Sequence, residues 1–232
     1  MRIGQPFGQR SAQGGRQYAP RSRFFIACEG RRTEYQYFKG LMQYSSELGI
    51  SPLVEMIPLR HGPNTGSNPL NIFEEAVEIL SQSNHYHPEL DRVSIIVDRD
   101  MHSFKEFQYE AMLALCRETG FHLCITNPCF ELWLLLHYSD LSEYDHALLL
   151  ENKKIGSRTQ TERYLMEKLG GRYNKSRIQF NKFFRGKVHI AISHSKAFPH
   201  DAEQLQNQLG TGVGTLIEFL RSEAKQAPYH YA

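Results

Sequence analysis

The sequence lacks any long apolar run and is poor in cysteine. No stretch of about 18 apolar residues, the length that spans a bilayer, occurs in its 232 residues. The N-terminal residues MRIGQPFGQR are not followed by the apolar segment that a signal peptide requires. The four cysteines lack the paired C-x-x-C spacing of a zinc site; they are Cys28, Cys116, Cys124 and Cys129. We therefore expect a soluble protein of the reducing cytoplasm that has no membrane association.

Charge is distributed unevenly along the chain, although the formal net charge is only +2. Residues 24–151 carry 8 basic and 19 acidic side chains, whereas residues 152–187 carry 11 basic and 2 acidic ones. This division suits acids gathered around a cation beside a basic surface that binds a polyanion. Two ordinary solvated faces would give the same bias, so charge alone leaves both interpretations open.

The first 22 residues differ in composition from the rest of the chain. They are rich in Gly, Gln, Arg and Pro and show no hydrophobic periodicity. Such a segment cannot bury enough apolar surface to offset the entropy that ordering would cost. We therefore predict that residues 1–22 form a flexible basic arm.

Short apolar runs alternate with helical patterns over residues 23–140. RFFIAC, LVEMIPL, RVSIIVDRD and HLCITN predict strands, and the segments between them have helical spacing. Asn127 and Pro128 predict the N-cap and the first residue of a further helix, CFELWLLLHY. The alternation indicates an α/β fold with a mostly parallel sheet flanked by helices. Residues 141–232 show only helical patterns and predict a basic helical extension that packs on this core.

Acidic residues end two of the predicted strands. Glu29 follows the first strand and precedes Gly30, and Asp98 and Asp100 end the third. In a parallel sheet such positions meet at the C-terminal edge. Residues two apart in an extended chain point the same way, so Asp98 and Asp100 can face one cation while Arg99 points elsewhere. A lone D-x-D is more often a solvated turn, but its combination with the Glu-Gly pair favours a site for a hard ion such as Mg²⁺ or Mn²⁺.

The same segments resemble a known family. FFIACEGRRTEYQYFKGL is similar to the first motif of Toprim proteins, a glutamate and a glycine after the first strand, and VDRD is similar to their aspartate-x-aspartate motif. More narrowly, CEGRRTEYQYF, VDRD and TNPCFELWLLLHY resemble the RloB-like family, a branch of Toprim-fold proteins linked to bacterial abortive-infection and restriction loci. The resemblance covers about residues 23–200. The chain departs from the family near its C-terminus, where LGTGVGT stands in place of an Asn-Pro-x-Thr-like segment.

The resemblance implies a Toprim-like, Mg²⁺-dependent nuclease, an endonuclease rather than an exonuclease, that acts in antiviral defence on RNA, transfer RNA included, or on DNA. Glu29 would be a general base or metal ligand, and Asp98 and Asp100 would be metal ligands. The family also implies an ABC-type ATPase encoded nearby, and this chain has no G-x-x-x-x-G-K-[ST] motif of its own. The alternative is a nucleic-acid or nucleotide sensor that keeps the metal site without turnover. A primase- or topoisomerase-like enzyme is disfavoured, because the chain leaves little room for accessory domains.

Two further carboxylates are candidates for the same site. Glu34 lies at the start of the first predicted helix and could bind a second metal ion, although helix starts favour acids in any case. Glu131 lies in CFELWLLLHY, where its apolar neighbours would make burial costly without a cation or another partner, and we predict a catalytic role for it. His102 is close to Asp100 and could donate a proton, or it could be an incidental turn residue.

The basic stretch supplies candidates for nucleic-acid binding, namely Lys175, Arg172, Arg177 and Lys182. Lys175 could contact a substrate phosphate or stabilise a developing negative charge. Any one lysine in so basic a stretch is more readily explained as solvated surface. Phosphate contacts predict salt-sensitive binding without indicating which nucleic-acid sequence is recognised. The oligomeric state stays open.

Overall fold

A computed structural model of the chain describes residues 22–226 apart from 31, 52, 58, 60–68 and 102. The predicted basic arm, except its last residue, and His102 lie outside the described residues. The strands are β1 (Phe24–Cys28), β2 (Val54–Met56), β3 (Arg92–Asp98), β4 (His122–Asn127), β5 (Lys154–Ile155), β6 (Arg158–Thr159) and β7 (Gly210–Thr211). The helices are α1 (Thr33–Gln43), α2 (Ser45–Leu48), α3 (Pro69–Ser81), α4 (Glu106–Thr119), α5 (Glu131–Leu135), α6 (His146–Glu151), α7 (Gln160–Lys168), α8 (Phe180–Phe183), the 3₁₀ turn η1 (Arg185–Lys187), α9 (Val188–Ser195), α10 (Ala202–Leu205) and α11 (Val213–Gln226).

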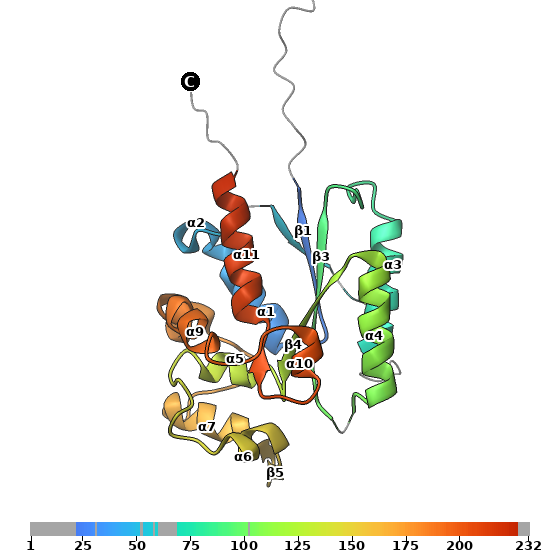
Figure 1. The fold of residues 1–232 in the computed structure, drawn as a ribbon. Helices are drawn as coiled ribbons and strands as arrows, with labels where there is room; N and C mark the ends of the chain where they lie inside the picture. The colour runs from blue at the N-terminus through green and yellow to red at the C-terminus, as the bar shows by residue number, and fades with distance from the viewer. Residues whose placement is uncertain are drawn as a thin grey trace, which may run out of the picture.

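Five strands form one mostly parallel sheet in the order β2-β1-β3-β4-β7. The first four strands run parallel, and β7 pairs antiparallel with β4 at one edge. Helices α3 and α4 cover one face, while α1, α5, α9 and α11 lie on the other (Figure 1). The α/β architecture predicted from the alternating pattern is therefore confirmed.

The strands are buried on both faces, which explains their continuous apolar runs. In β1, Phe25 and Ala27 join the cluster under α3 and α4, whereas Phe24, Ile26 and Cys28 join the cluster on the opposite face. Successive side chains of a strand alternate between faces, so one short run supplies both cores. The second cluster also contains Leu165 of α7 and Ile217 of α11, so residues on either side of position 140 share a core; Leu132 to Leu136 belong to it as well.

The helix predicted to start at Asn127 and Pro128 begins later. Asn127 is the last residue of β4 and pairs with Gly210 of β7, and its side-chain Nδ2 donates to the Leu205 carbonyl at 2.8 Å. The helix α5 starts at Glu131, with Phe130 as its N-cap. The prediction of Asn127 as N-cap was wrong because pairing and burial in the sheet hold this residue in the strand.

The part after residue 140 contains short strands as well as helices. Strands β5 and β6 form an antiparallel hairpin, whose turn includes Gly156 at φ +67°, a conformation that glycine adopts without strain. Strand β7 adds a further edge to the main sheet. The expectation of helices alone was wrong because strands of two residues leave no periodicity in a sequence. In the described part of the chain, none of the helices combines the length and the apolar character needed to cross a membrane.

Candidate active site

Glu29 and Asp98 lie side by side at the C-terminal edge of the sheet. The parallel pairing of β1 with β3 places Cys28 beside Ile96, and the Glu29 amide donates to the Ile96 carbonyl at 2.9 Å. The amide of Asp98 donates to Oε2 of Glu29 at 3.1 Å. The backbone of β3 thus fixes the carboxylate of Glu29 next to Asp98, as the two strand ends lead one to expect.

Glu34 reaches the same place from the first turn of α1. Its carboxylate packs directly on Gly30: a Cβ atom at position 30 would lie 1.8 Å from Oε2 of Glu34. Glu34 is buried, and burial, together with the charges of Glu131 and Glu29, raises its pKa to about 8. The glycine after Glu29 is therefore required for close approach of a second carboxylate rather than for turn geometry alone.

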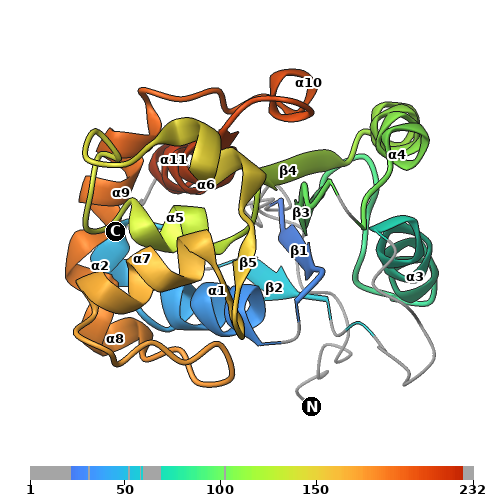
Figure 2. The ribbon, with the colours of Figure 1, turned by 90° about the horizontal axis from the view of Figure 1, so that it is seen from below.

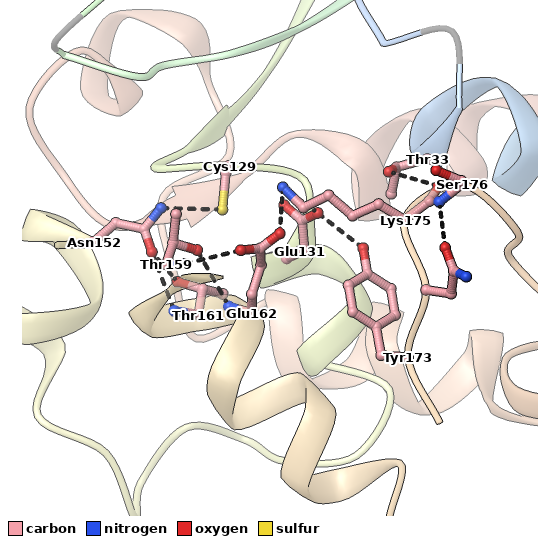
Figure 3. A network of polar contacts seen from close by, with 11 residues as sticks. Thr33, Cys129, Glu131, Asn152, Thr159, Thr161, Glu162, Tyr173, Lys175 and Ser176 are labelled. Carbon is pink, nitrogen blue, oxygen red and sulfur yellow. Dashed lines mark hydrogen bonds and ion pairs between the residues drawn. The ribbon is translucent and has the colours of Figure 1, made fainter. Parts of the chain in front are cut away.

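Glu131 enters the site from the start of α5, directly after β4. Its side chain is only 4% exposed, and Oε1 accepts hydrogen bonds from the Tyr173 hydroxyl at 2.8 Å and from Nζ of Lys175 at 3.1 Å. Lys175 also pairs with Oε1 of Glu162 at 2.6 Å. Figure 3 shows Lys175 extended between the two glutamates, with Tyr173 on the other side of Glu131. Glu131 is thus buried and paired, the condition under which its apolar neighbours permit a charge.

The carboxylates repel one another across a poorly solvated space. Burial raises the pKa of Asp98 well above its usual range, and the negative charges of Glu34, Glu29 and Glu131 raise it further, while Lys175 opposes them. Burial likewise raises the pKa of Glu29 to about 7, against the hydrogen bond from the Asp98 amide. A positive charge in their midst would relieve this repulsion.

Asp100 lies on the exposed rim of the site. Its Oδ2 accepts from the Ser103 hydroxyl at 3.0 Å, and its carbonyl accepts from the Phe104 amide at 2.7 Å. The intervening Arg99 is buried and turns the opposite way, where Nε donates to the Gln206 carbonyl at 2.9 Å. The alternation expected for D-x-D is thus present.

The donor chemistry of this cluster fits a hard divalent cation, since every candidate ligand is a carboxylate. Among the residues that the structure describes, however, no three His, Cys, Asp or Glu side chains converge as a ready ligand set. Glu131 is instead paired with Lys175. Binding a cation between these groups would therefore require side-chain rotation.

The four basic candidates separate into different environments. Lys175 points inward to Glu131, as described above. Arg172 and Lys182 lie over the ring of Phe183, with the guanidinium carbon 5.6 Å and Nζ 5.2 Å from its centroid. Arg177 is exposed, in a turn where its amide donates to the Asn174 carbonyl at 3.0 Å.

Glu162 and Tyr173 are site residues that sequence reasoning missed. Glu162 is the N3 residue of α7 in a capping box with Thr159, whose amide donates to Oε2 of Glu162 at 2.8 Å. The pattern T-x-x-E at 159–162 is the signal that could have drawn attention to it, although only as a helix start. For Tyr173 no local signal exists, because its partner Glu131 is 42 residues away.

The segment LGTGVGT, where the chain departs from the expected family pattern, is built for close packing. A Cβ atom at Gly210 would lie 2.3 Å from the Pro199 carbonyl oxygen, and one at Gly214 would lie 2.3 Å from Oγ of Ser195. Between them, the Thr211 hydroxyl contacts that of Thr126 at 2.8 Å. In this chain the segment thus forms β7 and the start of α11 against β4.

A family model described as RloB-like protein matches residues 24–220, which include every strand described above. The chain belongs to the RloB-like family. The match confirms the resemblance to this family that the Glu-Gly, D-x-D and NPCFELW segments indicated. Neither the curated proteins nor the solved structures contain a match.

Proposed function

We propose that this RloB-like protein is a divalent-cation-dependent nuclease of the Toprim type. The observation that supports this most directly is the grouping of Glu29, Glu34, Asp98 and Glu131 near the C-terminal edge of the sheet, where burial, and then the charges of the three glutamates, raise the pKa of Asp98. A cluster with this composition is suited to Mg²⁺ or Mn²⁺ and to phosphodiester hydrolysis. The substrate would be RNA, transfer RNA included, or DNA, and cleavage would be internal.

The residues of the chain would divide the work as follows. Asp98, Asp100 and Glu29 would hold the cation, with Glu34 as a further ligand. When bound, the cation lowers the pKa of a coordinated water and neutralises charge on the phosphate. Glu29 would act either as a metal ligand or as the general base, and in the second role its pKa of about 7 in the absence of a cation suits it to accept a proton near neutral pH. Glu131 would position Lys175, the cation that pairs with it at 3.1 Å.

The wider role follows from the family. RloB-like proteins are linked to abortive infection and restriction, so the nuclease would be the effector of a bacterial antiviral system. An ABC-type ATPase encoded nearby would be its partner and would supply the nucleotide hydrolysis. A cytoplasmic location is consistent with four unpaired cysteines, all of them buried.

One observation favours a second function, a nucleic-acid or nucleotide sensor without turnover. In the described residues the carboxylates do not form a ready ligand set, and Glu131 is paired with Lys175. A binding module could keep this arrangement, whereas a nuclease must rearrange it.

Cleavage of a labelled mixture of transfer RNA, single-stranded RNA and duplex DNA tests the proposal. The full chain would be assayed with Mg²⁺, Mn²⁺ or EDTA, alone and with the ATPase encoded nearby where there is one. We expect cation-dependent cutting that falls more than about a hundredfold in Asp98→Ala and Asp98→Asn, since loss of an outer partner of a metal ligand already costs 10- to 100-fold. The matched control is Glu110→Ala, which removes an exposed carboxylate from α4 on the other face of the sheet. Binding without cutting by the folded protein, with its partner present, would favour the sensor instead.

A further inference from the structure

A pocket of about 480 Å³ opens beside Asp100, at the same edge of the sheet as the carboxylates. Its apolar lining consists of Met101, Pro128 and Leu150, and its charged lining includes Lys153 and Lys154. Figure 2 looks onto this edge and shows β5 between the strand ends and the helices α6 and α7. Lys153 pairs with Glu151, which also lines the pocket, at 2.6 Å. The pocket thus combines an apolar surface, the ammonium of Lys154 and a candidate metal-binding carboxylate.

The hairpin β5–β6 determines which side chains face the pocket. Lys154 pairs across the hairpin with Thr159, and directly opposed residues project from the same face. Both line the pocket beside Asp100. The other pair includes Arg158, which instead lines a separate pocket of about 400 Å³ with Arg163. The exposed ammonium of Lys154 is therefore placed by strand alternation on the side of the active site.

The wall of the pocket is fixed by hydrogen bonds. Asn152 donates from Nδ2 to Sγ of Cys129 at 3.3 Å, and its Oδ1 accepts from the amide and hydroxyl of Thr161 at 3.1 and 2.8 Å. Thr159 is held to Glu162, which pairs with Lys175 (Figure 3). These contacts connect the hairpin to the carboxylate cluster, so the pocket has a defined position relative to the candidate catalytic groups.

We propose that this pocket binds one unpaired nucleotide next to the scissile phosphate, so that the preferred substrate is single-stranded or looped nucleic acid. The inference rests on the proposed nuclease function and adds the substrate class. The volume lies within the range of about 300–1,000 Å³ of small-ligand sites. An apolar wall is suited to the face of a base, and Lys154 is suited to a flanking phosphate. A base in a duplex is stacked and paired, and it cannot enter a pocket without leaving the helix at a cost in energy.

The test measures binding, so that it does not depend on turnover. The full chain carrying Asp98→Asn would be titrated by fluorescence anisotropy with Mg²⁺ present, using a labelled single strand and the blunt duplex of the same sequence. Both would be prepared as RNA and as DNA. We expect the single strand to bind about tenfold more tightly than the duplex. Adding Lys154→Ala should weaken single-strand binding at least about tenfold, the effect of losing one charge-assisted hydrogen bond, and leave duplex binding unchanged.

Two further variants keep the test specific. Met101→Ala, at an exposed apolar position, should reduce the preference for the single strand, whereas Lys196→Ala, which removes the same charge from the end of α9, should change neither affinity. Equal binding of single strand and duplex, or equal effects of Lys154→Ala and Lys196→Ala, would overturn the pocket assignment. The cleavage assay with Asp98→Ala tests the nuclease proposal separately, so the outcome of the binding test does not decide it. Comparing the affinities of the RNA and DNA forms of the single strand shows whether the pocket prefers ribose or deoxyribose.

Discussion

Replacing Lys175 with methionine should destabilise the fold measurably. Nζ of Lys175 lies 3.1 Å from Glu131 and 2.6 Å from Glu162, whose side chains are 4% and 10% exposed, whereas Lys175 itself is 48% exposed. Breaking a fully buried pair costs about 3–5 kcal/mol, and partial exposure of the lysine reduces this to about 2–3 kcal/mol. For a chain of this size, that loss corresponds to a fall of about 4–12 °C in Tm.

Thermal melts and urea titrations of the full chain in EDTA would measure this effect. Lys196→Met is the matched control, because the pair of Lys196 with Glu218 is exposed at both ends and should contribute less than about 1 kcal/mol. The double variant Lys175→Met with Glu131→Gln should recover part of the loss, since it removes one of the two uncompensated charges. A Tm for Lys175→Met within about 1 °C of the wild type would refute the reasoning that this lysine balances buried acids.

Two further predictions concern the cluster itself. Burial raises the pKa of Glu29 to about 7 and of Glu34 to about 8 from an ordinary 4.5, so the stability that these groups contribute is present at low pH and is lost as pH rises through 7 to 8. A bound cation favours the deprotonated carboxylates, so the rise in Tm on adding Mg²⁺ should be larger at about pH 8 than at about pH 6. A rise in Tm that does not depend on pH would argue against Glu29 and Glu34 as ligands. Gly30→Ala should displace the Glu34 carboxylate and reduce cleavage about a hundredfold while the urea midpoint changes little, whereas an unfolded Gly30→Ala protein would contradict the view that the flexible end of Glu34 can move.

The sequence was sufficient to predict that Glu29 and Asp98 lie together at one edge of the sheet. Glu29 and Asp98 each follow a buried apolar run, and parallel strands must bring such ends to one edge. The inward turn of Arg99 follows from the two-residue period of extended backbone in the same way. These predictions are local, or depend only on the strands being parallel, which is why they did not require knowledge of the packing.

The groups contributed by the second half of the chain were harder to predict. Lys175 was proposed as a phosphate contact because it lies in a basic stretch, yet its amine pairs with Glu131 and Glu162. The strands β5 and β6 are too short to give a pattern, so the pocket beside Asp100 could not be expected from the sequence. Both features depend on how the segments after residue 140 pack on the sheet.

Glu162 makes one contact that the local sequence predicts and one that depends on tertiary packing. One carboxylate oxygen accepts a hydrogen bond from the amide of Thr159, three positions earlier in the chain, and the capping pattern predicts this contact. The other pairs with Lys175, in the loop that follows α7, and Lys175 also pairs with Glu131 of α5, against which α7 packs. The same side chain therefore fixes the end of the hairpin and the cation nearest Glu131. A change in the packing of α7 would move the pocket wall and the charge balance of the carboxylates together, so the edge of the sheet alone cannot define the site.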